Sequence, residues 1–496
     1  MLQGLCITCD KEPDMILPIS GLKRSLTRSL RGMTASVAFA VTLMLTPATV
    51  QAENLSDALA DAYRNSGLLE QNRALLRFAD DEVAVQFAAL RPIVNWATDF
   101  TRQYGTSRSN QTFGVIRGSA ANELTVGLSM ELLLWDAGRT ELGVERAKES
   151  VLATREALRG VEQRVLLAAV QAYMSVRATS ETVGLRENNL RVISEELRAA
   201  NDRFEVGEVT RTDVALTEAR LAAARAGLAQ AQGDRAIAIE DFRAAVGRRP
   251  GSLTAPERRA MPAASPDAAK QVALRGHPDM RQAGHEITAA ELALAAARKS
   301  GLPTVNLTGS LGATDQFGSS NFSRGGTIGV EASGPIYQGG RINALQRQAV
   351  GRVDAARGNL HATREQIAQG TGSAWAQVEV ARAARAATEE QIRAAQVAFQ
   401  GVREEATLGA RTTLDVLNAE QELLDARANQ ITAASNEITA YYALLASMGL
   451  LTAEQLKLRV QIYDPAEYYN LVKSAPLARS AQGQQLDRVL KSLSKQ

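Results

Sequence analysis

The sequence between Phe204 and Leu221 is repeated, in diverged form, between Ala406 and Leu423. The first stretch reads FEVGEVTRTDVALTEARL and the second ATLGARTTLDVLNAEQEL, shifted by 202 residues. The matching pairs are Gly207 and Gly409, Thr210 and Thr412, Asp213 and Asp415, Val214 and Val416, Glu218 and Glu420, and Leu221 and Leu423. Solenoid repeats have periods of about 20–50 residues. The spacing therefore predicts a chain built from two copies of one domain half.

Another pair of motifs keeps this offset. LWDAGR at 134–139 lies 202 residues before IYQGGR at 336–341. Further upstream, LRPIVNW from Leu90 resembles GLPTVNL from Gly301 at an offset of 211, so the first copy has nine extra residues between these landmarks. Both halves should therefore contain the same elements in the same order: a helix, two strands and a long helical hairpin.

The hairpins are predicted from the absence of proline. No proline occurs between Pro92 and Pro250, or between Pro335 and Pro465, and aromatic residues make up only 4% of the chain. Proline interrupts helices, so both segments can form very long ones. A helix from Gly138 to Glu205 would be roughly 100 Å long at about 1.5 Å per residue. The steps between Leu158, Val161, Val165, Ala168 and Ala172 are typical of a coiled coil.

Four segments alternate apolar and polar residues, as strands with two different faces do. An ordinary half-buried sheet would alternate as well. Three features favour a membrane sheet: a strand length of about 10 residues, acidic residues on the polar face, and aromatic residues at the strand ends. The acids are Asp99, Glu123, Glu131 and Glu331, and the aromatics are Trp135 and Tyr337. The polar stretches at 105–120 and 313–326 are expected to be loops.

Four strands are too few to close a membrane barrel, and an open edge in lipid leaves backbone groups without partners. The chain must therefore oligomerise. Two copies would give eight strands and three copies twelve. The junctions where strands pass into long helices are marked by Trp135, Gly138, Arg139, Tyr337, Gly339, Gly340 and Arg341.

The first 52 residues have the pattern of a signal peptide. Basic residues from Lys23 to Arg31 precede the apolar run ASVAFAVTLML, and VQA at 50–52 is a small-residue cleavage site, so the mature chain would begin at Glu53. A transmembrane anchor would need about 20 apolar residues, more than this run offers. Both cysteines, Cys6 and Cys9, fall in this leader. We therefore expect no disulfide or metal site from them in the mature chain.

Composition and motifs argue against an enzyme and against nucleic-acid binding. The net charge is only +2, with no basic cluster interleaved with aromatic residues. The histidines His277, His285 and His361 match no common zinc spacing, and neither a G-x-S-x-G motif nor a P-loop is present. The expectation is a chain without catalytic residues, metal or cofactor.

The motifs GPIYQGGRINALQRQA, RFEVGEVTRTDV and LGARTTLDVLNAE, in this order in a duplicated chain, resemble the TolC family of outer-membrane exit ducts. The resemblance covers about Asn54 to Leu451. It implies an α+β membrane protein that forms a homotrimer, with a 12-stranded β-barrel, four strands per protomer, in the outer membrane of a Gram-negative bacterium. A long α-helical coiled-coil barrel would continue into the periplasm.

The implied organisation has five parts. Residues 1–52 are the signal peptide, 53–249 the first repeat, 250–270 a linker in the equatorial region, 271–450 the second repeat, and 451–496 an equatorial segment with a polar C-terminal tail. The tail from Leu477 onward is expected to lack regular structure. The implied partners are a periplasmic adaptor, an inner-membrane ABC exporter or RND pump, and outer-membrane lipid.

The resemblance also assigns roles to the repeated motif. Asp415 matches an acidic ring at the periplasmic mouth, and Asn418 stands where a second aspartate is expected. Arg411 matches a latch arginine whose partners are Thr212 and Asp213 on the neighbouring hairpin, whereas Ala406 replaces the tyrosine that shares this latch. The implied adaptor-docking residues at the hairpin ends are Val206, Gly207, Glu208, Val209, Leu408, Gly409, Ala410 and Thr412.

Two alternatives remain open at the level of sequence. A trimeric coiled-coil surface protein that forms no channel would also explain the heptads and the leader, although not the paired strands. For a duct, type I protein secretion and small-molecule efflux both fit the sequence.

Overall fold

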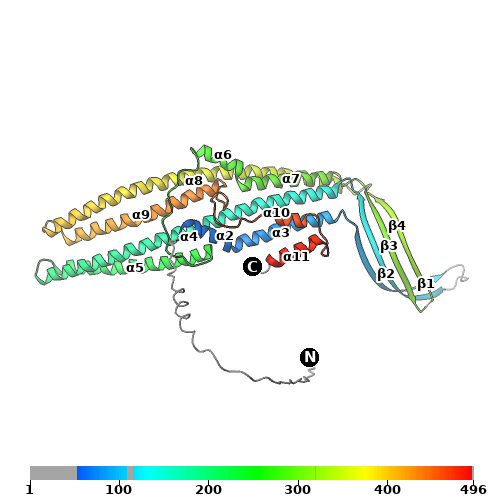
Figure 1. Ribbon diagram of the computed structural model, residues 1–496, viewed down its shortest axis with the longest axis horizontal. Helices are drawn as coiled ribbons and strands as arrows, with labels where there is room; N and C mark the ends of the chain where they lie inside the picture. The colour runs from blue at the N-terminus through cyan, green and yellow to red at the C-terminus, as the bar shows by residue number, and fades with distance from the viewer. Residues whose placement is uncertain (1–52, 109–115, 319, 494–496) are drawn as a thin grey trace, which may run out of the picture. The chain divides into compact units, whose positions relative to one another are not determined.

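The computed structural model describes residues 53–108, 116–318 and 320–493 (Figure 1). The predicted signal peptide, 1–52, lies outside these residues. The first half contains α2 (Leu55–Asn65), α3 (Gly67–Ala88), β1 (Ile93–Arg108), β2 (Ile116–Trp135), α4 (Arg139–Glu205) and α5 (Arg211–Val246). The second contains α6 (Pro266–Gly276), α7 (Pro278–Arg298), β3 (Thr304–Phe317), β4 (Phe322–Ser333), α8 (Arg341–Thr407) and α9 (Thr413–Ser447).

The duplication extends to backbone geometry. Helices α4 and α8 each have 67 residues, and each follows a glycine in the left-handed region, Gly138 at φ 78° and Gly340 at φ 83°. Each hairpin turns through another such glycine, Gly207 and Gly409, both at φ 80°. L-residues rarely adopt this conformation, which explains why glycine stands at these four repeated positions. The predicted pair of long helical hairpins is confirmed.

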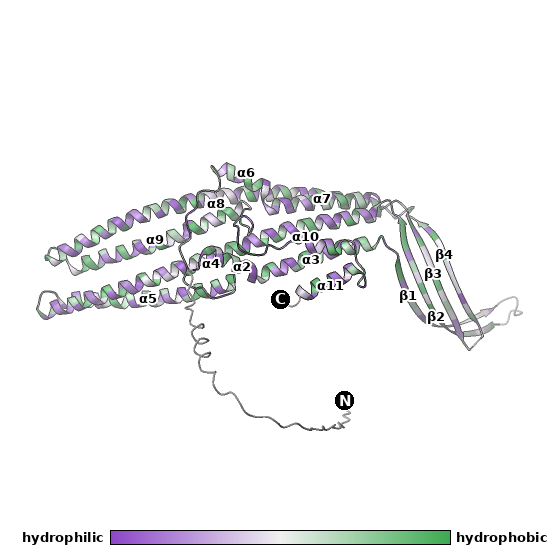
Figure 2. Ribbon diagram, in the orientation of Figure 1, coloured by the Kyte–Doolittle hydropathy of each residue, from purple (hydrophilic) through white to green (hydrophobic). Residues whose placement is uncertain are grey.

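The four strands form one antiparallel sheet in the order β1-β2-β3-β4. Its register places most of the apolar residues on one face. They are Val94, Trp96 and Phe100 of β1, Leu124, Val126 and Leu128 of β2, Leu307 and Leu311 of β3, and Ile328 and Val330 of β4. Figure 2 shows the resulting alternation along the strands. Many of these apolar side chains are exposed, Trp96 by 76% and Ile328 by 77%.

The opposite face is polar and hydrogen-bonded across strands. The side chain of Asn306 donates to Glu131 at 2.9 Å, and the hydroxyls of Ser310 and Thr327 lie 2.7 Å apart. The two predicted faces are therefore confirmed. The strands are longer than expected, with 16, 20, 14 and 12 residues. The loops predicted at 105–120 and 313–326 were too long, because their polar residues continue the strand pairing.

The two aromatic junction residues are not equivalent. Between Leu133 and Trp135 the pairing with β3 shifts by one residue, so Trp135 pairs with Val305 and joins the apolar face. Tyr337, by contrast, lies beyond the end of β4 at Ser333 and is 86% exposed. The placement of Tyr337 at a strand end was wrong, because the chain leaves the sheet at Gly334.

The main core surrounds the middle of α4, which packs against α2, α5 and α9. Tyr173 and Phe242 are fully buried there, with ring centroids 6.5 Å apart. The heptad prediction was partly wrong, since Ala168 is exposed and Ala169 is buried instead. Helix α4 contacts several neighbours, so its buried surface is broader than a two-helix seam.

After α9 the chain forms α10 (Pro465–Val472) and α11 (Ala481–Leu493). The expectation that the tail lacks structure was wrong, because α11 is held by its neighbour. The side chain of Gln482 donates to the carbonyl oxygen of Leu471 at 2.9 Å. Arg91, just after α3, holds the intervening turn by donating to the carbonyl oxygens of Ser474 and Ala475.

Candidate functional site

The ends of the two hairpins are built by the repeated motif. Thr210 begins α5 and Thr412 begins α9, each as the N-cap of a capping box. The amide of Asp415 donates to Thr412 Oγ1 at 3.2 Å, and the amide of Thr412 donates to Asp415 Oδ2 at 3.0 Å. The corresponding distances for Asp213 and Thr210 are 3.3 and 2.9 Å. The motif therefore specifies a glycine turn followed by a reciprocally capped helix start.

These caps also set the charge of the two aspartates. The backbone N–H of Thr412, followed by its hydroxyl, holds the pKa of Asp415 below its usual range. Thr210 does the same for the pKa of Asp213. Both carboxylates are therefore ionised at neutral pH. Asp415 has the charge that an acidic ring requires, while it also holds its own helix start.

Arg411 makes its ion pair within its own hairpin. Its Nε donates to Glu405 Oε2 at 2.8 Å, and this bond raises the pKa of Arg411. Among the described residues, no hydrogen bond or ion pair joins Arg411 to Thr212 or Asp213, which lie in the first turn of α5. The latch between neighbouring hairpins stays a prediction, since it concerns a contact in the assembled trimer.

A different pair of residues bridges the two hairpins of the chain. Arg220 of α5 donates through Nη2 to Asn418 Oδ1 of α9 at 2.9 Å. Asn418 was singled out as a departure from an acidic ring, and the structure gives it a specific partner. Sequence reasoning missed Arg220, because nothing in the motif indicates which side chain of α5 faces α9.

One buried carboxyl lies further along the same interface. Asn189 of α4 donates to Glu420 Oε1 of α9 at 3.1 Å, whereas Glu420 Oε2 has no hydrogen-bond partner among the residues described. Glu420 is 7% exposed and borders a cavity of about 250 Å³ between the hairpins. Burial raises the pKa of Glu420 to about 7, against the hydrogen bond from Asn189. The repeat identified this residue, but not its environment, because its counterpart Glu218 is exposed.

The predicted docking residues are at the surface of the two turns. Val206 is 71% exposed and Leu408 is 85% exposed. The remaining members, Gly207, Glu208, Val209, Gly409, Ala410 and Thr412, occupy the same two turns and helix starts. Both apolar side chains are therefore at the surface of the single chain.

The strand-to-helix junctions use one residue that the sequence did not reveal. Asp136 accepts hydrogen bonds from the amides of Gly138, Arg139 and Thr140 at 2.7–3.0 Å. It thereby satisfies the free N–H groups at the start of α4. The second half has Gln338 in the equivalent place, before Gly339, Gly340 and Arg341.

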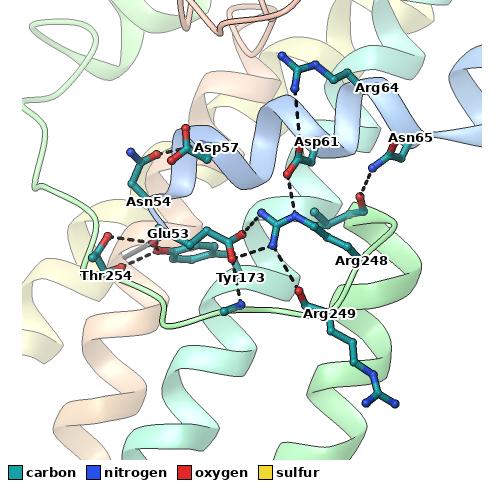
Figure 3. Close-up of polar contacts among 12 residues, drawn as sticks. Glu53, Asn54, Asp57, Asp61, Arg64, Asn65, Tyr173, Arg248, Arg249 and Thr254 are labelled. Carbon is teal, nitrogen blue, oxygen red and sulfur yellow. Dashed lines mark hydrogen bonds and ion pairs between the residues drawn. The ribbon is translucent and has the colours of Figure 1, made fainter. Parts of the chain in front are cut away.

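The base of the first hairpin is tied to the start of the described chain (Figure 3). Arg248 donates through Nη2 and Nη1 to the two carboxylate oxygens of Glu53 at 2.7 and 2.9 Å, and through Nε to Asp61 at 2.8 Å. The hydroxyl of Tyr173 is 2.9 Å from the carbonyl oxygen of Glu53. These contacts join α2, α4 and the segment after α5.

Neither a metal site nor a membrane-spanning helix is found in the described part of the chain. Its residues include no cluster of three His, Cys, Asp or Glu side chains that could hold a metal ion. None of the helices in the described ranges is both long enough and apolar enough to cross a membrane.

A four-stranded sheet with one apolar and one polar face, continued by two long helical hairpins, is the protomer fold of TolC-type outer-membrane channels. The Campylobacter jejuni CmeC outer membrane channel has this fold with a TM-score of 0.72, over 93% of this chain and 98% of that one, at 16% identity. The family described as Outer membrane efflux protein matches residues 58–248 and 270–450. The chain belongs to this family.

Named relatives agree with this assignment. Outer membrane efflux protein BepC of Brucella suis is 38% identical over 443 residues, which cover 88% of this chain and 95% of BepC. Alkaline protease secretion protein AprF of Pseudomonas aeruginosa is 27% identical over 67% of this chain and 71% of its own length. The resemblance to the TolC family is thus confirmed, and the protein is an outer-membrane channel component.

Proposed function

We propose that three copies of this chain close one 12-stranded barrel and serve as the passive exit duct of a tripartite export system. The observation that carries this proposal is the open sheet. In the single chain, β1 and β4 pair on one side only, and the apolar face is suited to lipid. Pairing β4 of each copy with β1 of the next satisfies both edges and places the polar face around a water-filled lumen.

The proposed gate is at the far ends of the hairpins. Asp415 of each copy would contribute one carboxylate to a ring around the axis, and Arg411 would contact Thr212 and Asp213 of a neighbouring hairpin when the mouth is closed. The pair of Arg411 with Glu405 then has to exchange partners on closure. Because both side chains of that pair are about half exposed, the exchange costs little.

The exposed turns around Val206 and Leu408 are the proposed docking surface for a periplasmic adaptor. Through it the duct would connect to an inner-membrane ABC exporter or RND pump. Two alternative cargoes have support in the relatives: AprF is named for protease secretion, and BepC for efflux.

Two measurements test the proposal. Native mass spectrometry of the purified protein should give a trimer, and that trimer should form channels in planar bilayers. A protease-resistant trimer without conductance would instead favour a non-channel surface protein. Supernatant proteins of the native strain and a deletion strain then separate the cargoes: loss of one or a few proteins, restored on complementation, indicates protein secretion, and an unchanged supernatant favours efflux.

A further inference from the structure

The apolar face of the sheet contains a groove. Ala313 of β3 is paired with Val126 of β2 on one side and with Arg324 of β4 on the other. The next pair toward the helices on this face is Leu311 with Leu128, beside Trp96 of β1. The small side chain of Ala313 therefore lies among large ones. Together these residues line a cavity of about 270 Å³.

Closure of the barrel would leave this groove accessible to lipid. Its floor is formed by β2 and β3, and it is flanked by Trp96 of the edge strand β1 and Arg324 of the edge strand β4. Edge strands pair with other copies through backbone groups in the plane of the sheet, so the side chains of this face still point outward. Ala313 precedes Phe317, the last residue of β3, by four residues. With a rise of about 3.3 Å per residue and a tilt near 40°, the groove is about 10 Å below the loop end of the strand. Because the long helices leave from the other end, the groove faces the outer leaflet.

Arg324 is an unexpected residue on this face. Its guanidinium lies 5.4 Å from the centre of the Phe322 ring, and among the described residues no carboxylate is within ion-pair distance of it. The acidic residue of this face nearest in the register is Asp315, which pairs with Phe322. An arginine on a lipid-facing surface is costly at the middle of the bilayer but costs little near the headgroups, where an anionic partner is within reach. A lipid phosphate would supply that partner at this depth.

We propose that the groove is a binding site for lipopolysaccharide, with an acyl chain over Ala313 and a lipid A phosphate at Arg324. The outer leaflet of a Gram-negative outer membrane consists largely of this lipid, and its phosphorylated glucosamine head carries both groups on one molecule. Leu128, Leu311 and Trp96 form the apolar wall for the chain. The inference rests on the proposed function, because it requires the closed barrel to present this face to lipid.

Native mass spectrometry of the detergent-solubilised trimer tests the site. The probes are diphosphorylated lipid A, phosphatidylglycerol and phosphatidylethanolamine, each added to delipidated protein. We expect wild-type trimers to retain up to three lipid A molecules. Arg324→Gln should weaken this retention about tenfold, and Ala313→Leu, which fills the groove with an apolar side chain, should weaken it by a similar factor.

Two control variants test whether the loss of lipid A retention is specific to the groove. Ala332→Leu enlarges another small residue of the same face, beside Val305 near the helical end, and should leave lipid A retention unchanged. Arg102→Gln removes a different cation of this face, closer to the loops, and should change retention less than twofold. Equal loss in Arg102→Gln would mean that the whole face attracts lipid A without a defined groove.

The outcomes separate this inference from the proposed function. Intact trimers that retain lipid A equally in wild type, Arg324→Gln and Ala313→Leu contradict the site alone. Equal retention of phosphatidylglycerol and lipid A contradicts the assignment to lipopolysaccharide. Wild-type protein that forms no trimer contradicts the proposed duct and removes the lipid-facing surface on which the inference depends.

Discussion

Asn189 of α4 donates a hydrogen bond to Glu420 of α9 at 3.1 Å, and this contact joins the two hairpins of one chain through a buried carboxyl. The exposed counterpart in the first repeat, Glu218, has no such environment. The duplicated sequence has thus kept a glutamate at both positions and given only one of them an interface. Any movement that separates the hairpins must transfer Glu420 from a poorly solvated site into water.

The first prediction concerns the pH dependence of conductance. The pKa of Glu420 is about 7 in the packed hairpins and would return toward 4.5 when they separate. Glu420 therefore binds a proton more tightly when the hairpins are packed than when they are separated. Its contribution to the free energy that favours the packed state is full below about pH 4.5 and is lost as pH rises through about 7. Mean conductance of the trimer in planar bilayers should therefore increase between pH 5 and pH 8.

Two isosteric variants separate the effect of this carboxyl from that of other titrating groups. One such group is Asp80, because burial raises its pKa to about 7 as well. Glu420→Gln should flatten the pH profile and hold conductance at the low-pH level. Glu218→Gln removes an exposed carboxyl at the equivalent position and should leave the profile as in wild type. A profile that persists unchanged in Glu420→Gln would show that another group controls the effect.

The second prediction separates the two roles of Asp415. Asp415→Ala removes both the ring charge and one half of the capping box, whereas Thr412→Ala removes the cap acceptor and keeps the carboxylate. Loss of a cap costs about 1 kcal/mol. If the Asp415 carboxylate keeps the mouth closed, Asp415→Ala should raise the resting conductance in bilayers. The resting conductance of Thr412→Ala should stay near that of wild type.

Arg411→Ala should also raise the resting conductance, because it removes the proposed latch. Thr210→Ala is the control for cap loss in the other hairpin. Equal increases for Thr412→Ala and Asp415→Ala would assign the effect to the helix start. Mostly closed traces for both Asp415→Ala and Arg411→Ala would contradict this gate.

The sequence predicted the architecture because the relevant signals are local. Proline-free segments, period-2 strands and a repeated glycine-threonine-aspartate motif each specify backbone geometry without distant contacts. The capping function of Asp213 and Asp415 could have been found in the same way, since threonine three residues before an acidic residue is a helix-start signal.

The features that were missed depend on tertiary packing. Nothing local distinguishes Glu420 from Glu218, or shows that Arg220 reaches Asn418. The shift of pairing before Trp135 is set by the register between β2 and β3, which a single strand does not encode. Helix α11 was missed because its polar composition outweighed its spacing of apolar residues, and because α10, which supports it, was not foreseen.

The third prediction concerns the hairpin turns. Gly409 has φ 80°, where an L-residue costs about 1–2 kcal/mol, so Gly409→Ala should destabilise the second hairpin by roughly that amount. Gly401, within α8 of the same hairpin, has open space where a Cβ would be added. Gly401→Ala should therefore stabilise by about 0.5–1 kcal/mol. Thermal unfolding should shift in opposite directions for the two variants, and equal shifts would contradict the role of the turn.

The last prediction concerns Arg248, which ties the predicted first residue of the mature chain to the base of the first hairpin (Figure 3). Glu53 is 7% exposed, so Arg248→Ala would leave its carboxylate buried without its bidentate partner. Removing one member of such a pair typically costs about 3–5 kcal/mol, and the partial exposure of Arg248 favours the lower end.

Arg248→Lys keeps the positive charge but loses the planar guanidinium that donates to both carboxylate oxygens of Glu53 and to Asp61. The thermal unfolding temperature of its trimer should therefore lie between those of wild type and Arg248→Ala. Combining Arg248→Ala with Glu53→Gln should cost less than the sum of the two single changes, because the second change removes the stranded charge. Strict additivity would show that the two side chains act independently. In that case the hydrogen bonds to the Glu53 backbone from Tyr173 and Thr254 would be what anchors the start of the chain.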